Sequence, residues 1–317
     1  MCTAIHTCGA RPLFGRTLDL ERSYDQAVIA TPQNFKWRFL HAGETTPRYA
    51  LLGTASLWQG MPLYFDAVNH AGLAMAGLNF PAYACYRPSV AGAINLASFE
   101  LIPYLLSQCS SVREATALLH RINITPDSVS ADLPATPLHW MLADAQASLV
   151  IEPREDGLHL HDNPYGVLTN SPPFPYHTAH LAAFAALSAA PPENRLCPDA
   201  PLAFFSRGMG ACGLPGDFSS ASRFVRAVFA KSHTLPAEQS MEVDRFFHIM
   251  DTVAVPRGCI LTEESQAVQT VYTCCYDLAD AAYYYTTYDC RRIRAVHLRH
   301  LPAGREGVTV FSMAGEG

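Results

Sequence analysis

Charge is scarce in this sequence. Only 16% of the 317 residues are charged, the formal net charge is −6 and the pI is about 6.1. Lys and Arg form no basic stripe, which excludes the electrostatic footprint of a nucleic-acid-binding protein. With 49% hydrophobic residues, the chain can bury a large core. We therefore expect one α+β domain over residues 2–317, with no nucleic-acid partner.

Long apolar runs and paired cysteines are also missing. No run reaches the roughly 20 residues of a membrane helix, and the chain does not open with a basic segment followed by an apolar one. The ten cysteines contain no Cys-x-x-Cys pair, so we expect them as small buried apolar groups in a reducing compartment. These absences predict a cytoplasmic protein without a membrane partner.

The N-terminus carries a candidate nucleophile. Cys2 follows Met1 directly, so removal of Met1 gives one residue with both a thiol and a free α-amine, which can act as its base. Arg16 and Asp19 can return beside Cys2 on a hairpin partner strand, where Arg16 favours the thiolate and Asp19 holds the amine. Two interpretations stay open at this point. The first is the nucleophile just described. In the second, Cys2 is an ordinary small residue, and Arg16 and Asp19 form a surface ion pair that contributes little to stability.

Hairpin patterns dominate the rest of the chain. Paired strands are predicted at residues 2–5 and 13–18, 62–68 and 73–78, 138–142 and 149–152, and 270–276 and 281–288. Residues 158–161 and 166–169 continue the third pair's sheet, and further strands are predicted at 27–30, 49–54 and 292–298. Helices are predicted at 99–106, 115–122 (opened by a capping box at Ser111), 177–190, 221–232 and 241–253. Because hairpins and helices come in separate blocks, we expect antiparallel sheets layered with helices.

Four other patterns suggest chemistry but lack the context for it. Residues 208–213 match G-x-G-x-x-G, yet no strand precedes them and no helix follows, which excludes dinucleotide binding. His159 and His161 share one strand face and could bind a metal, but no third ligand is suggested nearby, which favours a solvated strand face over a metal site. The adjacent Cys274 and Cys275 point to opposite faces of a strand. They are interpreted as buried packing, as are the tyrosines at 283–285.

Four downstream segments share the order of a known family. They are Gly-Leu-Asn-Phe-Pro at 77–81, Gly-Val-Leu-Thr-Asn-Ser-Pro at 166–172, Gly-Leu-Pro-Gly-Asp-Phe-Ser-Ser-Ala-Ser-Arg-Phe at 213–224 and Tyr-Tyr-Tyr-Thr-Thr-Tyr at 283–288. After Met-Cys-Thr at 1–3 and Phe-Gly-Arg at 14–16, they closely resemble the choloylglycine hydrolase family. This family of N-terminal nucleophile hydrolases comprises the bile salt hydrolases and the penicillin V acylases.

The resemblance implies a fold and a set of catalytic roles. The fold is an αββα sandwich, in which two antiparallel sheets lie between helix layers and Cys2 stands at the end of an inner strand. Cys2 corresponds to the nucleophile and its own amine to the base. Arg16 and Asp19 correspond to the charged pair around it.

Three further positions match the family's catalytic set. Asn170 corresponds to the asparagine whose side chain forms the oxyanion hole together with the backbone N–H of Asn79, and Arg223 to the arginine that completes the set. The implied reaction is acyl transfer through a Cys2 thioester, which water cleaves or which another amine takes up to give an N-acyl conjugate. It needs no metal and no organic cofactor.

The substrate is predicted less directly. In the family, asparagine at the position of Asn79 is typical of bile salt hydrolases, and tyrosine is commoner in penicillin V acylases, so we expect conjugated bile salts. Arg16 and Arg223 are candidates for attracting the anionic head group. Five residues lie in stretches that can line an apolar cleft or belong to the core: Leu18, Leu20, Trp58, Phe65 and Ala67.

Two other functions stay open. A penicillin V acylase would use the same machinery on a phenoxyacetyl amide, and a lipid-binding protein without catalysis would bind bile salt unchanged. The family's habit of forming homotetramers predicts an oligomer.

Overall fold

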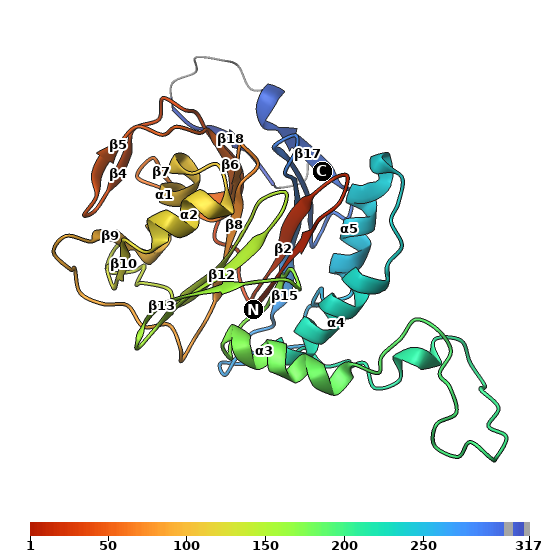
Figure 1. The fold of residues 1–317 in the computed structure, drawn as a ribbon. Helices are drawn as coiled ribbons and strands as arrows, with labels where there is room; N and C mark the ends of the chain where they lie inside the picture. The colour runs from red at the N-terminus through yellow and green to blue at the C-terminus, as the bar shows by residue number, and fades with distance from the viewer. Residues whose placement is uncertain (301–306, 314–317) are drawn as a thin grey trace.

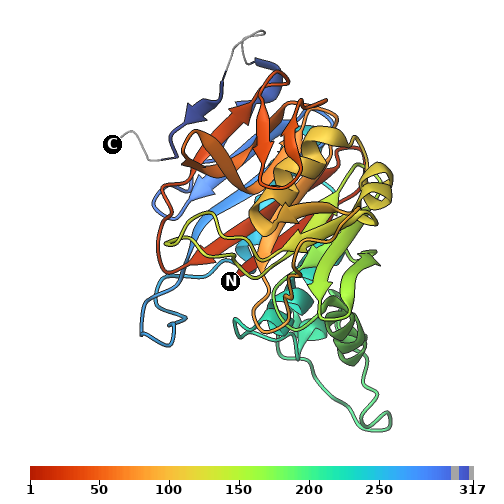
Figure 2. The same cartoon turned by 90° about the vertical axis from the view of Figure 1, so that its left-hand side faces the viewer.

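The structure, a computed structural model, describes residues 1–300 and 307–313. Two large sheets pack face to face, and helices cover the outer face of each (Figures 1 and 2). All strand pairs within these two sheets are antiparallel. This is the αββα sandwich expected from the sequence. None of the described helices is long and apolar enough to cross a membrane.

The first sheet has six strands in the order β14-β1-β2-β15-β16-β17. Its centre is the hairpin of β1 (Cys2–Thr7) and β2 (Leu13–Leu20), in which Cys2 pairs with Leu18. The other strands are β14 (Val167–Leu168), β15 (Gln269–Asp277), β16 (Ala282–Thr287) and β17 (Arg294–His297). Segments from both ends of the chain therefore lie side by side around Cys2.

The second sheet has eight strands in the order β13-β12-β11-β8-β7-β6-β3-β18. In chain order these are β3 (Ala27–Thr31), β6 (Leu51–Trp58), β7 (Met61–Asn69), β8 (Ala74–Asn79), β11 (Leu138–Ala143), β12 (Ser148–Arg154), β13 (Gly157–Asp162) and β18 (Thr309–Phe311). Two small sheets flank it: β4 (Trp37–Phe39) with β5 (Gly43–Thr45), and β9 (Ile94–Ala97) with β10 (Ile122–Thr125).

Helices cover the two outer faces. On the eight-stranded sheet lie α1 (Leu101–Gln108) and α2 (Val112–Leu119), and on the six-stranded sheet α4 (Ser220–His233) and α5 (Glu242–Asp251), while α3 (Phe174–His180) packs against α4 (Figure 1). The hydroxyl of Ser111 accepts the N–H of Glu114 at the start of α2, which confirms half of the predicted capping box; the Glu114 carboxylate accepts the N–H of Ser110 and not that of Ser111. Single 3₁₀ turns complete the helical structure.

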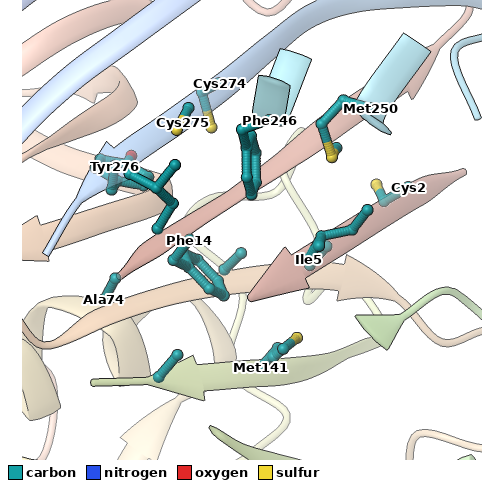
Figure 3. Close-up of a cluster of buried hydrophobic side chains, with 14 of the residues drawn as sticks. Cys2, Ile5, Phe14, Ala74, Met141, Phe246, Met250, Cys274, Cys275 and Tyr276 are labelled. Atoms are coloured by element: carbon teal, nitrogen blue, oxygen red, sulfur yellow. The ribbon is translucent and has the colours of Figure 1, made fainter. Parts of the chain in front are cut away.

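The larger hydrophobic core joins the two sheets to α4 and α5. Figure 3 shows Phe246 and Met250 of α5 on the outer face of the six-stranded sheet and Phe14 on its inner face, toward Ala74 and Met141 of the other sheet. A Cβ on Gly15 of β2 would lie 2.0 Å from the carbonyl oxygen of Cys274, so the tight fit of β2 against β15 requires glycine there. A second core fills the space between the eight-stranded sheet and α1. Cys2 thus starts a strand that is held from both faces.

The predicted hairpins and helices are confirmed with three exceptions. The helix predicted at 177–190 is wrong: α3 begins at Phe174 and gives way after His180 to a 3₁₀ turn that ends at Phe184. Residues 181–190 contain no buried position, so no packing stabilises a longer helix. The helix predicted to reach 122 ends at Leu119, because 122 belongs to β10.

The third exception is the strand predicted at 166–169. It does not continue the sheet of β12 and β13; β14 pairs with β1 in the six-stranded sheet. The chain changes sheets at a turn in which the Asn163 side chain accepts the N–H of Gly166 and donates to the carbonyl of Val167. Gly166 has φ +60°, a conformation that favours glycine. This turn brings residues 169–170 beside Cys2.

Candidate active site

Cys2 opens the innermost hairpin at the wall of a large cavity. The cavity has a volume of about 710 Å³, within the usual range of small-molecule sites. Cys2 belongs to its lining although the residue is only 2% exposed. A thiol at the edge of a cavity of this size can reach a ligand while most of the residue stays out of water.

The backbone nitrogen of Cys2 is held by a side chain. It donates to Oδ1 of Asn170 at 2.9 Å. Met1 precedes it, with the Met1 amine donating to the carbonyl of Asp19 and the Asp19 N–H donating back to the carbonyl of Met1. With Met1 present the Cys2 nitrogen is an amide; without Met1 the same atom, beside the same oxygen, is an α-amine.

Arg223 connects the residues around this nitrogen. The guanidinium, on α4 and fully buried, donates through Nη1 to the carbonyl of Cys2 and to the Thr3 hydroxyl (2.6 Å), and through Nη2 to Oδ1 of Asn170 (2.7 Å). Its Nε donates to the carbonyl of Phe218. Burial lowers the pKa of Arg223, and the Asp19 carboxylate and the Cys2 sulfur act against this. A single planar fork thus fixes both Cys2 and Asn170.

Asn79 and Asn170 approach each other from the two sheets. The Nδ2 of Asn170 donates to the carbonyl of Asn79 at 2.8 Å. The N–H of Phe80 donates to the carbonyl of Pro137, so the adjacent antiparallel pair of Asn79 and Leu138 is not hydrogen-bonded. The N–H of Asn79 therefore points away from β11, on the side where its carbonyl meets Asn170. Both asparagines present donors on this side.

Arg16 is the buried cation of the cavity wall. Its Nη1 donates to the carbonyl of Gly77 (3.1 Å) and lies 3.6 Å from the Asp66 carboxylate, and its Nε donates to the carbonyl of Thr17. Burial alone would lower the pKa of Arg16, but the Cys2 sulfur, Tyr272 and Asp66 raise it. Nη2 has no partner within the described chain. Arg16 is thus fixed, charged and left with one donor for a ligand.

Asp19 lies on β2, one residue after Leu18, which is the pairing partner of Cys2. Its Oδ1 accepts the hydroxyl of Thr270 (2.6 Å) and its Oδ2 that of Thr17 (3.0 Å). The Thr17 hydroxyl in turn accepts the N–H of Thr3. The carboxylate makes no direct bond to the Cys2 nitrogen, which donates to Asn170, and its hydrogen-bond chain ends at the N–H of Thr3. Asp19 therefore holds the backbone next to Cys2 and does not hold the Cys2 nitrogen itself.

Four of the five predicted cleft residues line the cavity: Leu18, Leu20, Trp58 and Phe65. Ala67 does not; it is fully buried in the core under α1. The reason is a β-bulge, since Thr54 pairs with Asp66 while the next residue, Ala55, pairs with Tyr64. Phe65 is the extra residue. The alternation that would place 65 and 67 on one face is broken between them.

Two parts of the site were missed from the sequence. Another part of the cavity wall is formed by residues 129 and 132–138. In the sequence this segment shows only a run of apolar residues and prolines without strand periodicity, so it was not predicted to line a site. Asp66 is the other. Its buried carboxylate accepts the hydroxyls of Tyr272 and Tyr276 and lies beside Arg16, and the sequence signal was only a lone acid inside an apolar strand.

The motifs set aside from the sequence have no part in this cavity. Residues 209–211 form a 3₁₀ turn, so residues 208–213 have neither strand nor helix around them. His159 pairs with Asp156, and no group of three or more His, Cys, Asp and Glu among residues 1–300 and 307–313 is placed to hold a metal. Cys274 and Cys275 are fully buried in the core, as predicted.

Known proteins match the chain over nearly its full length. The family model of linear amide C–N hydrolases, choloylglycine hydrolase family, matches residues 2–307. A bile salt hydrolase/transferase of Lactiplantibacillus plantarum is 42% identical, covering 95% of this chain and 93% of the relative. One of Clostridium perfringens is 38% identical, covering 94% and 92%.

Two solved structures share the fold of this chain. The C2A mutant of a conjugated bile acid hydrolase from Clostridium perfringens superposes with a TM-score of 0.92 at 35% identity, covering 98% of this chain and 96% of that one. A penicillin V acylase from Agrobacterium tumefaciens shares the fold, with a TM-score of 0.78 at 20% identity over 99% and 92% of the two chains. The residues assembled around Cys2 therefore stand in a chain that belongs to the choloylglycine hydrolase family of linear amide C–N hydrolases.

Proposed function

We propose that this enzyme hydrolyses the amide bond of glycine- or taurine-conjugated bile salts. The observation that carries the proposal is the position of Cys2, whose backbone nitrogen rests on Asn170 at the wall of an apolar cavity. The relatives from Lactiplantibacillus plantarum and Clostridium perfringens, which match over more than nine-tenths of the chain, bear the name bile salt hydrolase/transferase.

The first chemical step is attack of the Cys2 sulfur on the amide carbonyl. Removal of Met1 frees the α-amine, which takes the thiol proton and later gives it to the departing nitrogen of glycine or taurine. Negative charge develops on the carbonyl oxygen, and the N–H of Asn79 and the Nδ2 of Asn170 are the donors for it. The C–N bond breaks and a C–S bond remains.

The second step releases the bile acid. The same amine, now neutral, activates a water that attacks the thioester, and the sulfur leaves with the proton returned through the amine. An amine that enters instead of water forms an N-acyl conjugate, so we propose aminoacyl transfer as a side activity. Arg223 keeps Cys2 and Asn170 in one arrangement through both steps, and no cofactor takes part in either.

The cavity suits a rigid apolar acyl group. Leu18, Leu20, Trp58 and Phe65 line it, and burying a hydrocarbon skeleton against such a surface contributes roughly 25 cal/mol per Å². The unpartnered Nη2 of Arg16 supplies positive charge near Cys2 for the anionic end of the conjugate. The apolar cavity lining therefore matches the hydrocarbon skeleton of a conjugated bile salt, and Arg16 matches its anionic head group.

Penicillin V acylase activity is the alternative. It would use the same nucleophile on a phenoxyacetyl amide, and the similarity to the Agrobacterium tumefaciens acylase supports the shared fold alone. Asn79, which is typical of bile salt hydrolases at this position, favours the first function. Conjugated bile salts and penicillin V therefore belong in the same assay.

We also propose that the protein is a cytoplasmic homotetramer. A reducing cytoplasm keeps Cys2 as the thiol that the reaction needs. Residues 185–208 form a long projecting arm (Figure 1), on which Leu196 and Phe205 are about 90% exposed. Contiguous apolar patches mark interaction surfaces, and we propose that these two side chains contribute to such a patch between subunits. Light scattering of wild type and of Leu196→Ser/Phe205→Ser tests this: a mass of four chains is expected only for wild type, and a monomeric wild type would contradict it.

The function is tested by release of glycine and taurine from glycocholate and taurocholate, beside hydrolysis of penicillin V, with enzyme whose intact mass shows loss of Met1. We expect cleavage of the bile salts and its loss in Cys2→Ala. Hydrolysis of penicillin V alone would assign the chain to the acylases, and retention of activity in Cys2→Ala would refute the mechanism.

A further inference from the structure

His139 lies between the two segments that carry the oxyanion-hole donors. It is on β11 and fully buried. Its ring stacks on that of Phe80, the residue after Asn79, with centroids 4.3 Å apart and planes 5° from parallel. Its Nε2 lies 2.9 Å from the carbonyl oxygen of Thr169, the residue before Asn170. One side chain therefore contacts the neighbours of both asparagines.

The hydrogen bond to Thr169 fixes the ring. A carbonyl oxygen only accepts, so Nε2 must carry a proton. Nδ1 faces Oε1 of Glu152 at 3.4 Å, and the same oxygen accepts the N–H of Phe174 at the start of α3. Although burial opposes it, His139 and His161 hold the pKa of Glu152 near 2, so this partner is an anion at neutral pH. Glu152 thereby ties the orientation of His139 to the start of α3.

The backbone of Asn170 is held independently on its other side. His177 of α3 lies with Nε2 2.9 Å from the carbonyl of Asn170, and the Ser220 hydroxyl accepts the N–H of Asn170 and donates to its carbonyl. These contacts hold only the segment of Asn170. The contact of His139 is different, because it also reaches the end of β8 through Phe80 and so supports, beside the direct hydrogen bond from Asn170 to the Asn79 carbonyl, the separation of the two donors.

We propose that His139 is a positioning residue that holds the Asn79 and Asn170 donors at their working separation. The inference rests on the catalytic function proposed above. His139 is not among the cavity residues, so it touches no substrate and acts through Phe80 and Thr169. A displacement of about 1 Å at a catalytic donor can lower the rate about 100-fold. Loss of the His139 contact should therefore affect the chemical step and leave substrate binding intact.

The test compares three substitutions in enzyme trimmed of Met1. His139→Leu removes the donor, His139→Gln places an amide nitrogen near the position of Nε2, and His139→Asn places one near Nδ1, too short to reach Thr169. For glycocholate we expect kcat to fall about 10- to 100-fold in the Leu and Asn variants with KM within about threefold of wild type. Most of the loss should be recovered in His139→Gln.

A second readout separates positioning from general damage. Iodoacetamide alkylates the Cys2 sulfur without building an oxyanion. Because Cys8, Cys212 and Cys259 are free and exposed, the alkylation of Cys2 is followed by mass spectrometry of the N-terminal peptide, and its rate should equal that of wild type in all three variants. The matched control is His159→Leu, on the neighbouring part of the same sheet, whose ring contacts the exposed Asp156; its kcat should be unchanged.

Each outcome is decisive. A His139→Leu enzyme with wild-type kcat, or equal kcat in the Gln and Asn variants, overturns the positioning role even if the Leu variant is poorly folded. A loss of kcat accompanied by an equal loss of Cys2 alkylation also overturns it. A wild-type enzyme that cleaves no conjugate would instead refute the proposed function, which the wild-type assay alone reveals.

Discussion

The sharpest prediction concerns Asn170→Asp. The substitution keeps the oxygen that accepts the Cys2 nitrogen (2.9 Å) and Arg223 Nη2 (2.7 Å), and it replaces the donor that meets the Asn79 carbonyl at 2.8 Å. One oxyanion donor is typically worth about 3 to 4 kcal/mol of barrier, so kcat should fall roughly 100- to 1,000-fold at about 1.4 kcal/mol per factor of ten. The fold should persist, because the new carboxylate pairs with Arg223.

Asn170→Ala is the companion variant. It loses the same donor and also the oxygen, which leaves a buried Arg223 donor without its partner at a cost of about 1 to 3 kcal/mol. Steady-state kinetics on glycocholate and urea unfolding of both variants separate the effects: both should lose kcat, and the Ala variant should lose more stability, because the Asp variant keeps the partners of Cys2 and Arg223 and loses only the hydrogen bond to the Asn79 carbonyl. An Asn170→Asp enzyme within tenfold of wild type would refute the assignment of Asn170 as an oxyanion donor.

Three other predictions follow from the packing and the buried charges. Trp58→Ala should raise KM for glycocholate about tenfold with kcat unchanged, since roughly 1.4 kcal/mol of apolar contact is lost; a changed kcat at constant KM would contradict its place in the cavity wall. Gly15→Ala, which drives a Cβ to 2.0 Å from the carbonyl of Cys274, should cost about 1 to 3 kcal/mol or more of unfolding free energy, whereas Gly216→Ala meets nothing within 4 Å and should be nearly neutral. Burial, aided by Lys231, lowers the pKa of His6 to about 4, so the folded state binds the proton less readily than the unfolded state. The free energy of unfolding should therefore fall by about 3 kcal/mol as pH drops from 6.5 to 4. Urea unfolding of His6→Gln across this pH range should lack that decrease.

The sequence predicted what depends on local periodicity. The hairpin of β1 and β2 was predictable because alternating apolar residues flank a turn, and this hairpin alone brings Arg16 and Asp19 to the strand beside Cys2. The candidate catalytic set came from the family resemblance carried by the two N-terminal segments and the four downstream segments. Local sequence patterns could not predict that these residues lie close together, because Asn170 reaches Cys2 only where the chain changes sheets at Gly166.

Two failures have the same physical origin. Ala67 was named with Phe65 as a residue of a stretch that can line a cleft, and the bulge at Phe65 places Ala67 on the other face of the sheet. Asp66 was overlooked because its partners Tyr272 and Tyr276 lie more than 200 positions further along the chain. Bulges and pairings between distant strands depend on the packing of the whole sandwich, which single-sequence patterns do not contain.

The central claim is that Cys2 attacks as an N-terminal residue whose amine is the base. The most direct measurement is mass spectrometry of enzyme quenched with acid during turnover of glycocholate, beside a control with one alanine inserted between Met1 and Cys2. The trimmed enzyme should carry a cholyl group on Cys2, and the control, which keeps the thiol but has no amine on Cys2, should carry almost none. A cholyl group on another residue, or equal labelling of both enzymes, would contradict the account.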